Sequence, residues 1–498
     1  MQRIHTLSRR ELNTIMHFTG NACLLLAVAM LVPLIVAVIY KEPQYFTPFI
    51  FSAVISAVIG FSFLKLFKVE IEMTLKVAMI FSTIIWLIAS ALGALPYYFS
   101  GELSYLNAYF EAMSGFTTTG FSMFTHLDIL PYTINFWRAF TQWIGGFGII
   151  FLLLVVLRST GVDISRLYLA GGGNEEKLAP SMKHSSRIIV YLYLFFTALG
   201  IILFLLAGMP LFDSIFQTFV TLSTGGFAMH NTNVLFYHNV WIEIAAMIIM
   251  MIGATNFALL FTVLKGDWKE YFKDIETKVA YSLIIISTVL VTFALYNNHV
   301  YGNDLLLTFR FALFQMVSAI TTTGLQTAFY PNLLSKWIGL GTFLLTILMI
   351  IGAGSLSTGG GIKWLRFGVL IKGITWQVKS FILPGTAVMP KKIHHVTELN
   401  ITDDLLRITG AFVFTYFVIY IISVIIVLIY YSDISRVIFE VASALSNVGL
   451  SSGIITPNTP VVVKLVFIID FWMGRLEIWP VLLLIALTIN NITRKIHL

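Results

Sequence analysis

The sequence predicts an all-α membrane protein with four pseudo-repeats of helix, re-entrant pore loop and helix around one central pore, plus two extra N-terminal transmembrane helices. Three observations predict this fold. Only 11% of the 498 residues are charged, against about 25% in a soluble domain. Long apolar stretches recur along the chain, and one short motif recurs four times between them. The low charge excludes a soluble protein, and the recurring motif indicates internal repetition.

The apolar stretches are nearly long enough to cross a membrane, which takes roughly 20 helical residues. Stretches of this kind cover 24–40, 49–67, 77–95, 138–157, 188–206, 240–264, 279–296, 337–351, 409–430 and 461–490. The sequence therefore predicts about ten spans, all helical because lipid offers backbone groups no other hydrogen-bond partner.

Most of the 31 lysines and arginines fall in segments that lie on one side of the predicted membrane. The positive-inside rule places this side, with both termini, in the cytoplasm. The net charge of +7 is then a topology signal, and its spread over short segments excludes a nucleic-acid footprint. Cys23 is the only cysteine, so we expect no disulfide framework and no cysteine metal site.

The repeated motif is a Phe followed by Glu or Gln, placed ten and nine residues before a glycine. The four copies begin at Phe110, Phe216, Phe314 and Phe439 and end at Gly120, Gly226, Gly324 and Gly449. The stretch before the hydroxyl residues covers only about 15 Å as a helix, roughly half a bilayer. We predict half-helices that enter from outside and return as extended loops, in repeats at 70–165, 166–270, 271–400 and 401–498 after two extra helices at 1–69.

Four such loops facing one another can replace the water shell of an ion with backbone carbonyls, as potassium filters do. Glycine permits the required backbone angles, and the negative ends of the half-helices favour a cation. The predicted potassium-binding residues are Thr118, Thr119, Gly120, Thr224, Gly225, Gly226, Thr322, Thr323, Gly324, Asn447, Val448 and Gly449. The alternative, a turn that merely ends each helix, does not explain four copies in one register.

A glycine-rich break in the third repeat predicts an intramembrane gating loop at 352–361, since each glycine weakens a helix by about 1 kcal/mol. The residues concerned are Gly352, Gly354, Ser355, Ser357, Thr358, Gly359, Gly360 and Gly361. A passive kink is the alternative. Arg475 is a second gating candidate, because a cation within a span is costly and usually functional. An ion pair with Asp470 or Glu477 is the structural alternative.

These residues, together with Trp143-Ile144-Gly145-Gly146-Phe147-Gly148 and Phe471-Trp472-Met473-Gly474-Arg475-Leu476-Glu477, resemble the Trk/Ktr/HKT superfamily of potassium transporters, specifically the TrkH and TrkG type. The resemblance implies one filter glycine per loop, and Gly120 in the first loop implies potassium rather than sodium. It also implies a homodimer in a bacterial inner membrane. A cytoplasmic TrkA-like nucleotide-binding subunit would move the loop that blocks the pore. The fourth filter, Ser-Asn-Val-Gly, departs from the threonine-rich pattern.

Two rival transporters stay open, a sodium-selective member and a proton- or sodium-coupled potassium symporter. An enzyme is not expected, because the spans contain no His-Glu-x-x-His, Gly-x-Ser-x-Gly or clustered aspartates. We expect no cofactor, and the glycines at 171–173 do not predict a nucleotide site. Glu111, Gln217, Gln315 and Glu440 are expected to bond to backbone behind the filter, and His394 and His395 to lie on a solvated surface rather than in a metal site.

Overall fold

The computed structural model describes residues 7–159, 178–328, 337, 339–384 and 392–496, with backbone alone at 151–159, 178–186 and 490–496. Helices make up nearly all of the described regular structure, as the sequence predicts. The predicted boundary at 165/166, the glycines at 171–173 and the basic residues Arg166 and Lys177 lie outside the described residues.

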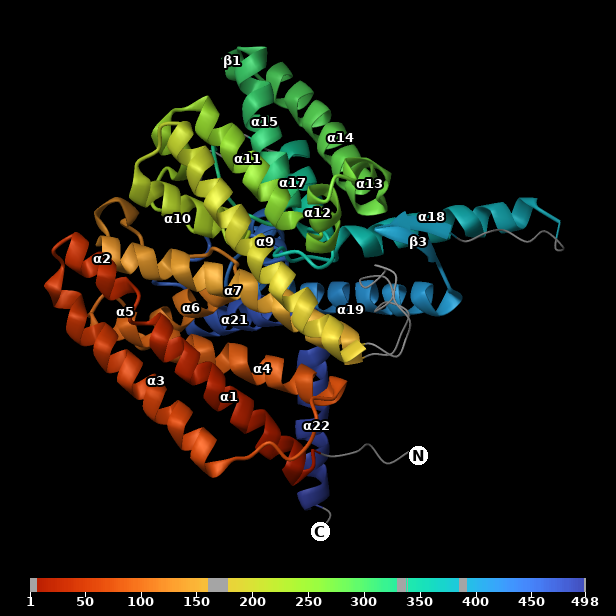
Figure 1. Cartoon of the computed structure of the whole chain (residues 1–498). Coiled ribbons are helices and arrows are strands. Elements are labelled where there is room, and N and C mark those ends of the chain that lie inside the picture. The colour runs from red at the N-terminus through yellow and green to blue at the C-terminus, as the bar shows by residue number, and fades with distance from the viewer. Residues whose placement is uncertain (1–6, 160–177, 329–336, 338, 385–391, 497–498) are drawn as a thin grey trace.

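The N-terminal pair of helices packs side by side at one outer flank of the molecule (Figure 1). The elements are α1 (Arg9–Ala29), α2 (Pro33–Ile39), the 3-10 turn η1 (Pro43–Tyr45) and α3 (Phe46–Leu66). A capping box between Ser8 and Glu11 begins α1. The helices approach closely where Gly20 faces Gly60, since a Cβ on either glycine would lie 2.9 Å from the other's carbonyl oxygen.

The order of a long helix, a short helix and a second helix then recurs four times. The first set is α4 (Leu75–Gly93), α5 (Leu95–Phe99), α6 (Tyr105–Phe116), η2 (Leu127–Ile129) and α7 (Tyr132–Ser159). The second is α9 (Leu178–Leu206), α10 (Leu211–Leu222), η4 (Asn233–Tyr237), α11 (Val240–Ala254) and α12 (Phe257–Leu264). The short helices α6 and α10 have 12 residues each, too few to cross a bilayer.

The third set carries the small amount of β-structure. It comprises α13 (Trp268–Lys273), α14 (Ile275–Asn297), β1 (Val300–Asn303), α15 (Leu305–Ile320), α17 (Leu340–Ile351), α18 (Trp364–Ile382), β2 (Lys392–His395) and β3 (Thr397–Asn400). The antiparallel hairpin β2–β3 pairs Ile393 with Leu399. The fourth set is α19 (Asp403–Leu428), α20 (Ile434–Leu445), α21 (Val461–Arg475) and α22 (Trp479–Ile496). Helix α18 projects away from the body of the molecule (Figure 1).

Among the described residues, six helices are long and apolar enough to cross a membrane, or seven if the bent pair α11–α12 counts as one span. The sequence predicts about ten spans, which is more, because it does not show that several of the apolar stretches are broken into shorter helices. Helices α11 and α12 meet at 110°. Helix α17 ends at Gly352, whose φ is +72°, and α21 ends just before Glu477 and Ile478, with φ of +57° and +64°. Left-handed backbone ends an α-helix, so apolar length alone overestimates unbroken spans.

Candidate functional site

Four loops of identical backbone design follow the short helices, and we call 117–120, 223–226, 321–324 and 446–449 the pore loops. The second residue of each is left-handed, with φ between 51° and 55°, and the final glycine also has positive φ. The third residue of each donates its N–H five residues back, from Thr119 to Ser114, Gly225 to Val220, Thr323 to Ser318 and Val448 to Ser443, at 2.8–3.0 Å. The shared motif therefore produces one loop conformation four times.

The four pore loops form a closed ring. A Cβ added to Gly120 would lie 2.3 Å from the carbonyl oxygen of Gly225 in the second loop. The same construction places Gly226 against Thr323 O, Gly324 against Val448 O and Gly449 against Thr119 O, at 1.8, 1.8 and 2.3 Å. Each glycine thus abuts the carbonyl that precedes the glycine of the next loop, and the fourth loop abuts the first. All twelve predicted filter residues are brought together.

A cavity of about 140 Å³ opens above this ring, and all four final glycines line it. The rest of its lining is mostly polar, with Asn231, Asn233, Gln326 and Ser122 beside Leu127 and Ala228. The Arg138 side chain also contributes to the lining, but its guanidinium is bound to Glu111 at 2.9 Å and lies over the Phe227 ring. The ring of glycines therefore faces a polar vestibule.

Buried carboxylates and amides support the loops from behind. Glu111 accepts from Met123 N at 2.6 Å, Gln315 accepts from Thr327 N at 3.0 Å, and Glu440 accepts from Ile455 N at 3.2 Å. The predicted backbone role is confirmed for these three. Gln217 differs, because it donates to the Thr221 hydroxyl at 3.2 Å.

Loop 352–361 lies directly against the other side of the ring, and all ten of its residues are buried. The Thr358 hydroxyl lies 2.9 Å from Leu222 O and accepts from the Thr224 hydroxyl at 3.2 Å. Gly360 N donates to the Thr322 hydroxyl at 2.8 Å, and a Cβ on Gly360 would lie 2.2 Å from Ser446 O. The loop therefore contacts the second, third and fourth pore loops at once.

Arg475 binds this loop rather than an acidic neighbour. Its guanidinium donates to Thr358 O at 2.5 Å and to Gly145 O at 3.0 Å. Of the two acids that the sequence offered as partners, Glu477 pairs with Arg366 at 2.5 Å and Asp470 accepts from the Ser423 hydroxyl at 2.7 Å. The ion-pair alternative is therefore wrong among the described residues.

Sequence reasoning missed two polar side chains at the site, Lys363 and Gln142, and one contact of the predicted filter residue Asn447. Lys363 is buried and donates to Gly359 O within loop 352–361. Gln142 donates to Gly225 O at 2.8 Å and accepts from Phe227 N at 3.2 Å, holding the second pore loop. Asn447 donates to the Thr119 hydroxyl at 2.9 Å. For Gln142 the sequence held one indication of a role at the site, because this residue directly precedes the Trp143 motif.

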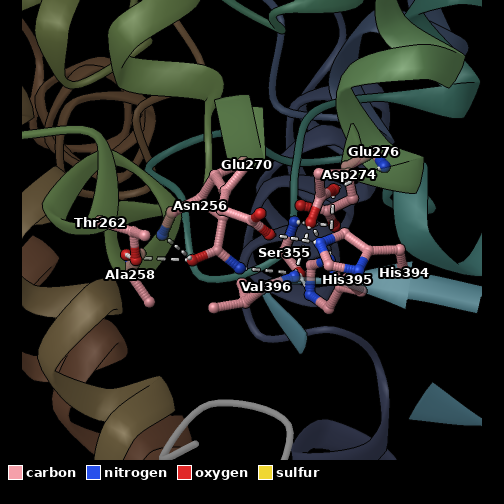
Figure 2. A network of polar contacts seen from close by, with 11 residues as sticks. Asn256, Ala258, Thr262, Glu270, Asp274, Glu276, Ser355, His394, His395 and Val396 are labelled. Carbon is pink, nitrogen blue, oxygen red and sulfur yellow. Dashed lines mark hydrogen bonds and ion pairs between the residues drawn. The ribbon is translucent and has the colours of Figure 1, made fainter. Parts of the chain in front are cut away.

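The adjacent histidines do not share a solvated surface. His394 is partly exposed and binds Glu270 at 2.7 Å. His395 is fully buried, because β2 turns alternate side chains inward, and its Nδ1 lies 3.0 Å from Asp274 Oδ2 (Figure 2). Burial lowers the pKa of His395, but the carboxylates of Glu276 and Asp274 outweigh it, so the net shift is upward. The expectation of a solvated surface is wrong for His395.

The short helices ending at a closed ring of carbonyls, inside a bundle of apolar helices, define an integral membrane protein of the ion-conducting class. Comparison with known proteins gives the family. The family described as TrkH, cation transport protein, matches residues 41–492. The chain belongs to this family.

Individual relatives agree over nearly the whole chain. An uncharacterised cation transporter of Methanocaldococcus jannaschii is 34% identical over 96% of both chains. The Trk system potassium uptake protein TrkH of Escherichia coli is 29% identical over 95% of this chain and 99% of its own. The crystal structure of the potassium transporter TrkH from Vibrio parahaemolyticus superposes with a TM-score of 0.84 at 26% identity, covering 95% of this chain and 98% of that one.

Proposed function

We propose that this protein takes up potassium through a channel-like pore whose selectivity filter is the ring of four pore loops. The observation that carries the proposal is the closed ring, in which each glycine meets a carbonyl of the next loop. Carbonyl rings replace the hydration shell of potassium. The printed names of the Escherichia coli and Vibrio parahaemolyticus relatives, both potassium transporters, support the choice of ion. The proposed activity is transport, not catalysis, and potassium is its ligand, with no cofactor.

Loop 352–361 is the proposed gate, held by Arg475 in a position that blocks the pore. Its support is the contact of Thr358 and Gly360 with three pore loops, which places loop 352–361 directly beneath the ring. The guanidinium of Arg475 adds a positive charge against this loop, which lies beneath the ring. Opening then requires the bonds from Thr358 and Arg475 to break.

The assembly that we propose is a homodimer in a bacterial inner membrane, with both termini cytoplasmic and each subunit holding one pore. A cytoplasmic TrkA-like nucleotide-binding subunit would release the gate. The relatives named as members of a Trk system support a multi-component assembly. The proposed division of the chain is two extra helices at 1–69 and repeats at 70–165, 166–270, 271–400 and 401–498.

The test is uptake of isotopic rubidium into liposomes that hold the purified protein, with potassium or sodium as competitor. We expect potassium, but not sodium, to suppress uptake. Equal suppression by sodium would replace the proposal with a weakly selective or sodium-carrying transporter. Because the gate is closed, the same assay is run on Arg475→Gln, which we expect to conduct faster. An absence of uptake by both proteins, in a correctly folded preparation, would overturn the proposal.

A further inference from the structure

A second polar site lies beside Ser355 of loop 352–361, and its residues come from outside the pore loops (Figure 2). Asp274 caps the first turn of α14, Glu276 lies in that turn, and His395 ends strand β2. Each of these side chains is at most 1% exposed. One ligand atom from each residue lies within 4.8 Å of the others. Three ionisable groups from two distant parts of the chain therefore converge in a buried space.

Hydrogen bonds hold the side chains of Asp274 and Glu276 in place, but one carboxylate oxygen of Glu276 has no partner among the described residues. Asp274 accepts from Val396 N and Glu276 N, each at 2.8 Å, as well as contacting His395. Glu276 Oε1 accepts from Ser355 N at 2.7 Å, while its Oε2 is buried without a hydrogen-bond partner. His395 Nε2 lies 3.5 Å from the Ser355 hydroxyl. The cluster thus reaches loop 352–361 through Ser355.

An unsatisfied carboxylate oxygen is costly to bury unless a cation compensates it. Among the described residues no lysine or arginine pairs with Glu276, since the nearby Lys363 donates to Gly359 O and Arg475 binds backbone carbonyls. The rest of the cluster adds a second carboxylate and one imidazole. This mixture of one nitrogen and two carboxylate oxygens suits Zn²⁺ and similar transition metals, whereas Ca²⁺ and Mg²⁺ prefer oxygen ligands alone.

The spacing is compatible with such an ion after a small adjustment. Zinc–ligand bonds of about 2.0–2.2 Å place neighbouring ligand atoms roughly 3.4 Å apart in a tetrahedron. The three groups lie within 4.8 Å of one another, so a bound ion would draw them slightly closer. Asp274 is already held by two backbone N–H groups, and Glu276 by one. These bonds are of the kind that orient metal ligands.

We propose that Asp274, Glu276 and His395 form a binding site for a divalent transition-metal ion of the Zn²⁺ type, which fastens the β2–β3 hairpin to loop 352–361. The ion would neutralise Glu276 and hold Ser355 in its present position. Binding itself does not depend on the potassium-pore proposal. The consequence for transport rests on that proposal: a bound ion stabilises the blocking position of the loop and slows uptake.

Binding is tested on the purified full-length protein, stripped with a chelator and dialysed against Zn²⁺. We expect one ion per chain, and at least a tenfold loss of affinity in both His395→Gln and Glu276→Gln. The matched control is His394→Gln, which removes the neighbouring imidazole and should bind as wild type does. Thermal unfolding with and without Zn²⁺ checks that each variant is folded, and only wild type and His394→Gln should be stabilised by the ion.

Spectroscopy and transport complete the test. With Co²⁺ as the probe, a visible absorption band should appear in wild type and disappear in His395→Gln. No Zn²⁺ binding by wild type, or equal binding by folded His395→Gln, would overturn the site.

In the rubidium assay, Zn²⁺ should slow uptake by wild type and not by His395→Gln. Zn²⁺ binding without this effect on uptake would overturn the link between the site and loop 352–361. An absence of rubidium uptake by both wild type and Arg475→Gln would instead count against the pore, with the dialysis result unaffected.

Discussion

The four pore-loop glycines are required for space as well as for backbone angle. Gly324 has a φ of +80° and its missing Cβ would lie 1.8 Å from Val448 O. Left-handed backbone costs a residue with a side chain roughly 1–2 kcal/mol. The collision adds to this cost, because the atom met is a backbone carbonyl that cannot rotate away without moving the fourth loop. One methyl group therefore displaces a neighbouring carbonyl of the ring.

This argument predicts that Gly324→Ala abolishes selective rubidium uptake, with a fall of at least tenfold. The matched control is Gly101→Ala, because Gly101 has a similar φ of +76° but no atom within 4 Å of its missing Cβ. The control should lose some thermal stability and retain uptake. Equal loss in both variants would mean that backbone strain, rather than the ring contact, explains the glycine.

Next to the vestibule residue Asn231, His230 is a residue whose charge responds to pH. Its Nδ1 lies 2.9 Å from Asp128 Oδ1, and its Nε2 lies 3.8 Å from Asp213 Oδ2. Burial lowers the pKa of His230, but the two carboxylates outweigh it and raise the pKa above its ordinary value. A raised folded pKa stabilises the protein below the unfolded pKa of about 6.5, and this stability is lost as the pH rises through the folded value.

The difference in thermal midpoint between wild type and His230→Gln should therefore be larger at pH 6 than at pH 8.5. Scanning fluorimetry of the purified protein at both pH values measures it. His126→Gln, at an exposed histidine before η2, is the control for the loss of one imidazole. A His230→Gln difference that is constant with pH would contradict the raised pKa.

Sequence reasoning located the residues of the ring but not all of their partners. The register of the Phe and Gly positions was visible because it recurs along the chain. The bond from Gln142 to Gly225 joins residues 83 positions apart, and the Arg138–Glu111 pair joins two helices. Such contacts depend on packing and carry no local signal. His395 was misjudged because the alternation of a four-residue strand is too short to predict burial.

At the scale of elements, each pore loop is followed by a helix, and three of these four helices are broken on the side of the ring away from the vestibule. The breaks lie between α11 and α12, between α17 and α18, and between α21 and α22, and only α7 continues. Asn256 accepts from Ala258 N at 2.9 Å and so begins α12 after the bend. The glycine-rich break was predictable from composition. The break between α11 and α12 contains Thr255 and Asn256, and the break between α21 and α22 contains the left-handed pair Glu477 and Ile478. Neither has the glycine-rich composition that predicts a break, so the sequence predicted one span in each case.

The longest of these breaks, loop 352–361, is held to the ring by few bonds, so single substitutions should shift its position. Thr358→Val removes the hydroxyl that lies 2.9 Å from Leu222 O and 2.8 Å from Gly253 O. A net loss of about 1 kcal/mol for such a bond predicts rubidium uptake roughly fivefold faster. Thr409→Val is the control, since the Thr409 hydroxyl donates to Leu405 O of its own helix α19. Slower or unchanged uptake in Thr358→Val would show that the loop does not limit flow.

The Arg138–Glu111 pair joins the short helix α6 to α7, and both side chains are completely buried. Removing one partner of a buried pair leaves an uncompensated charge and costs about 3–5 kcal/mol. Glu111→Gln should therefore lower the thermal midpoint by several degrees. Glu398→Gln breaks the exposed pair with Lys392, which is worth only about 0–1 kcal/mol, and should leave the midpoint unchanged. Similar midpoints for both variants would mean that Glu111 stabilises the loop through neutral hydrogen bonds alone.

At the scale of the whole molecule, the two faces differ in structure as well as in charge. On one face the vestibule opens above the pore loops, and Leu127 and Asn231 are among the residues that line it. The opposite side holds the start of α1 and the end of α22, which meet at α4 through Ile15, Val77 and Leu487. The projecting helix α18 and strand β3 lie at the far side of the molecule from α2 and α5 (Figure 1). Basic residues in the hairpin and its surroundings predict that this second side faces the cytoplasm.

The proposed orientation can be tested because the chain has a single cysteine, the buried Cys23. In a Cys23→Ala background, Ile129→Cys places a thiol on the vestibule side, at a residue that is 80% exposed. Glu398→Cys places one on the hairpin, where the side chain is 71% exposed. A maleimide that cannot cross membranes should label the first variant in intact cells and the second only after the membrane is opened. The reverse pattern would invert the molecule, so that the polar vestibule would face the cytoplasm and the gate would lie outside.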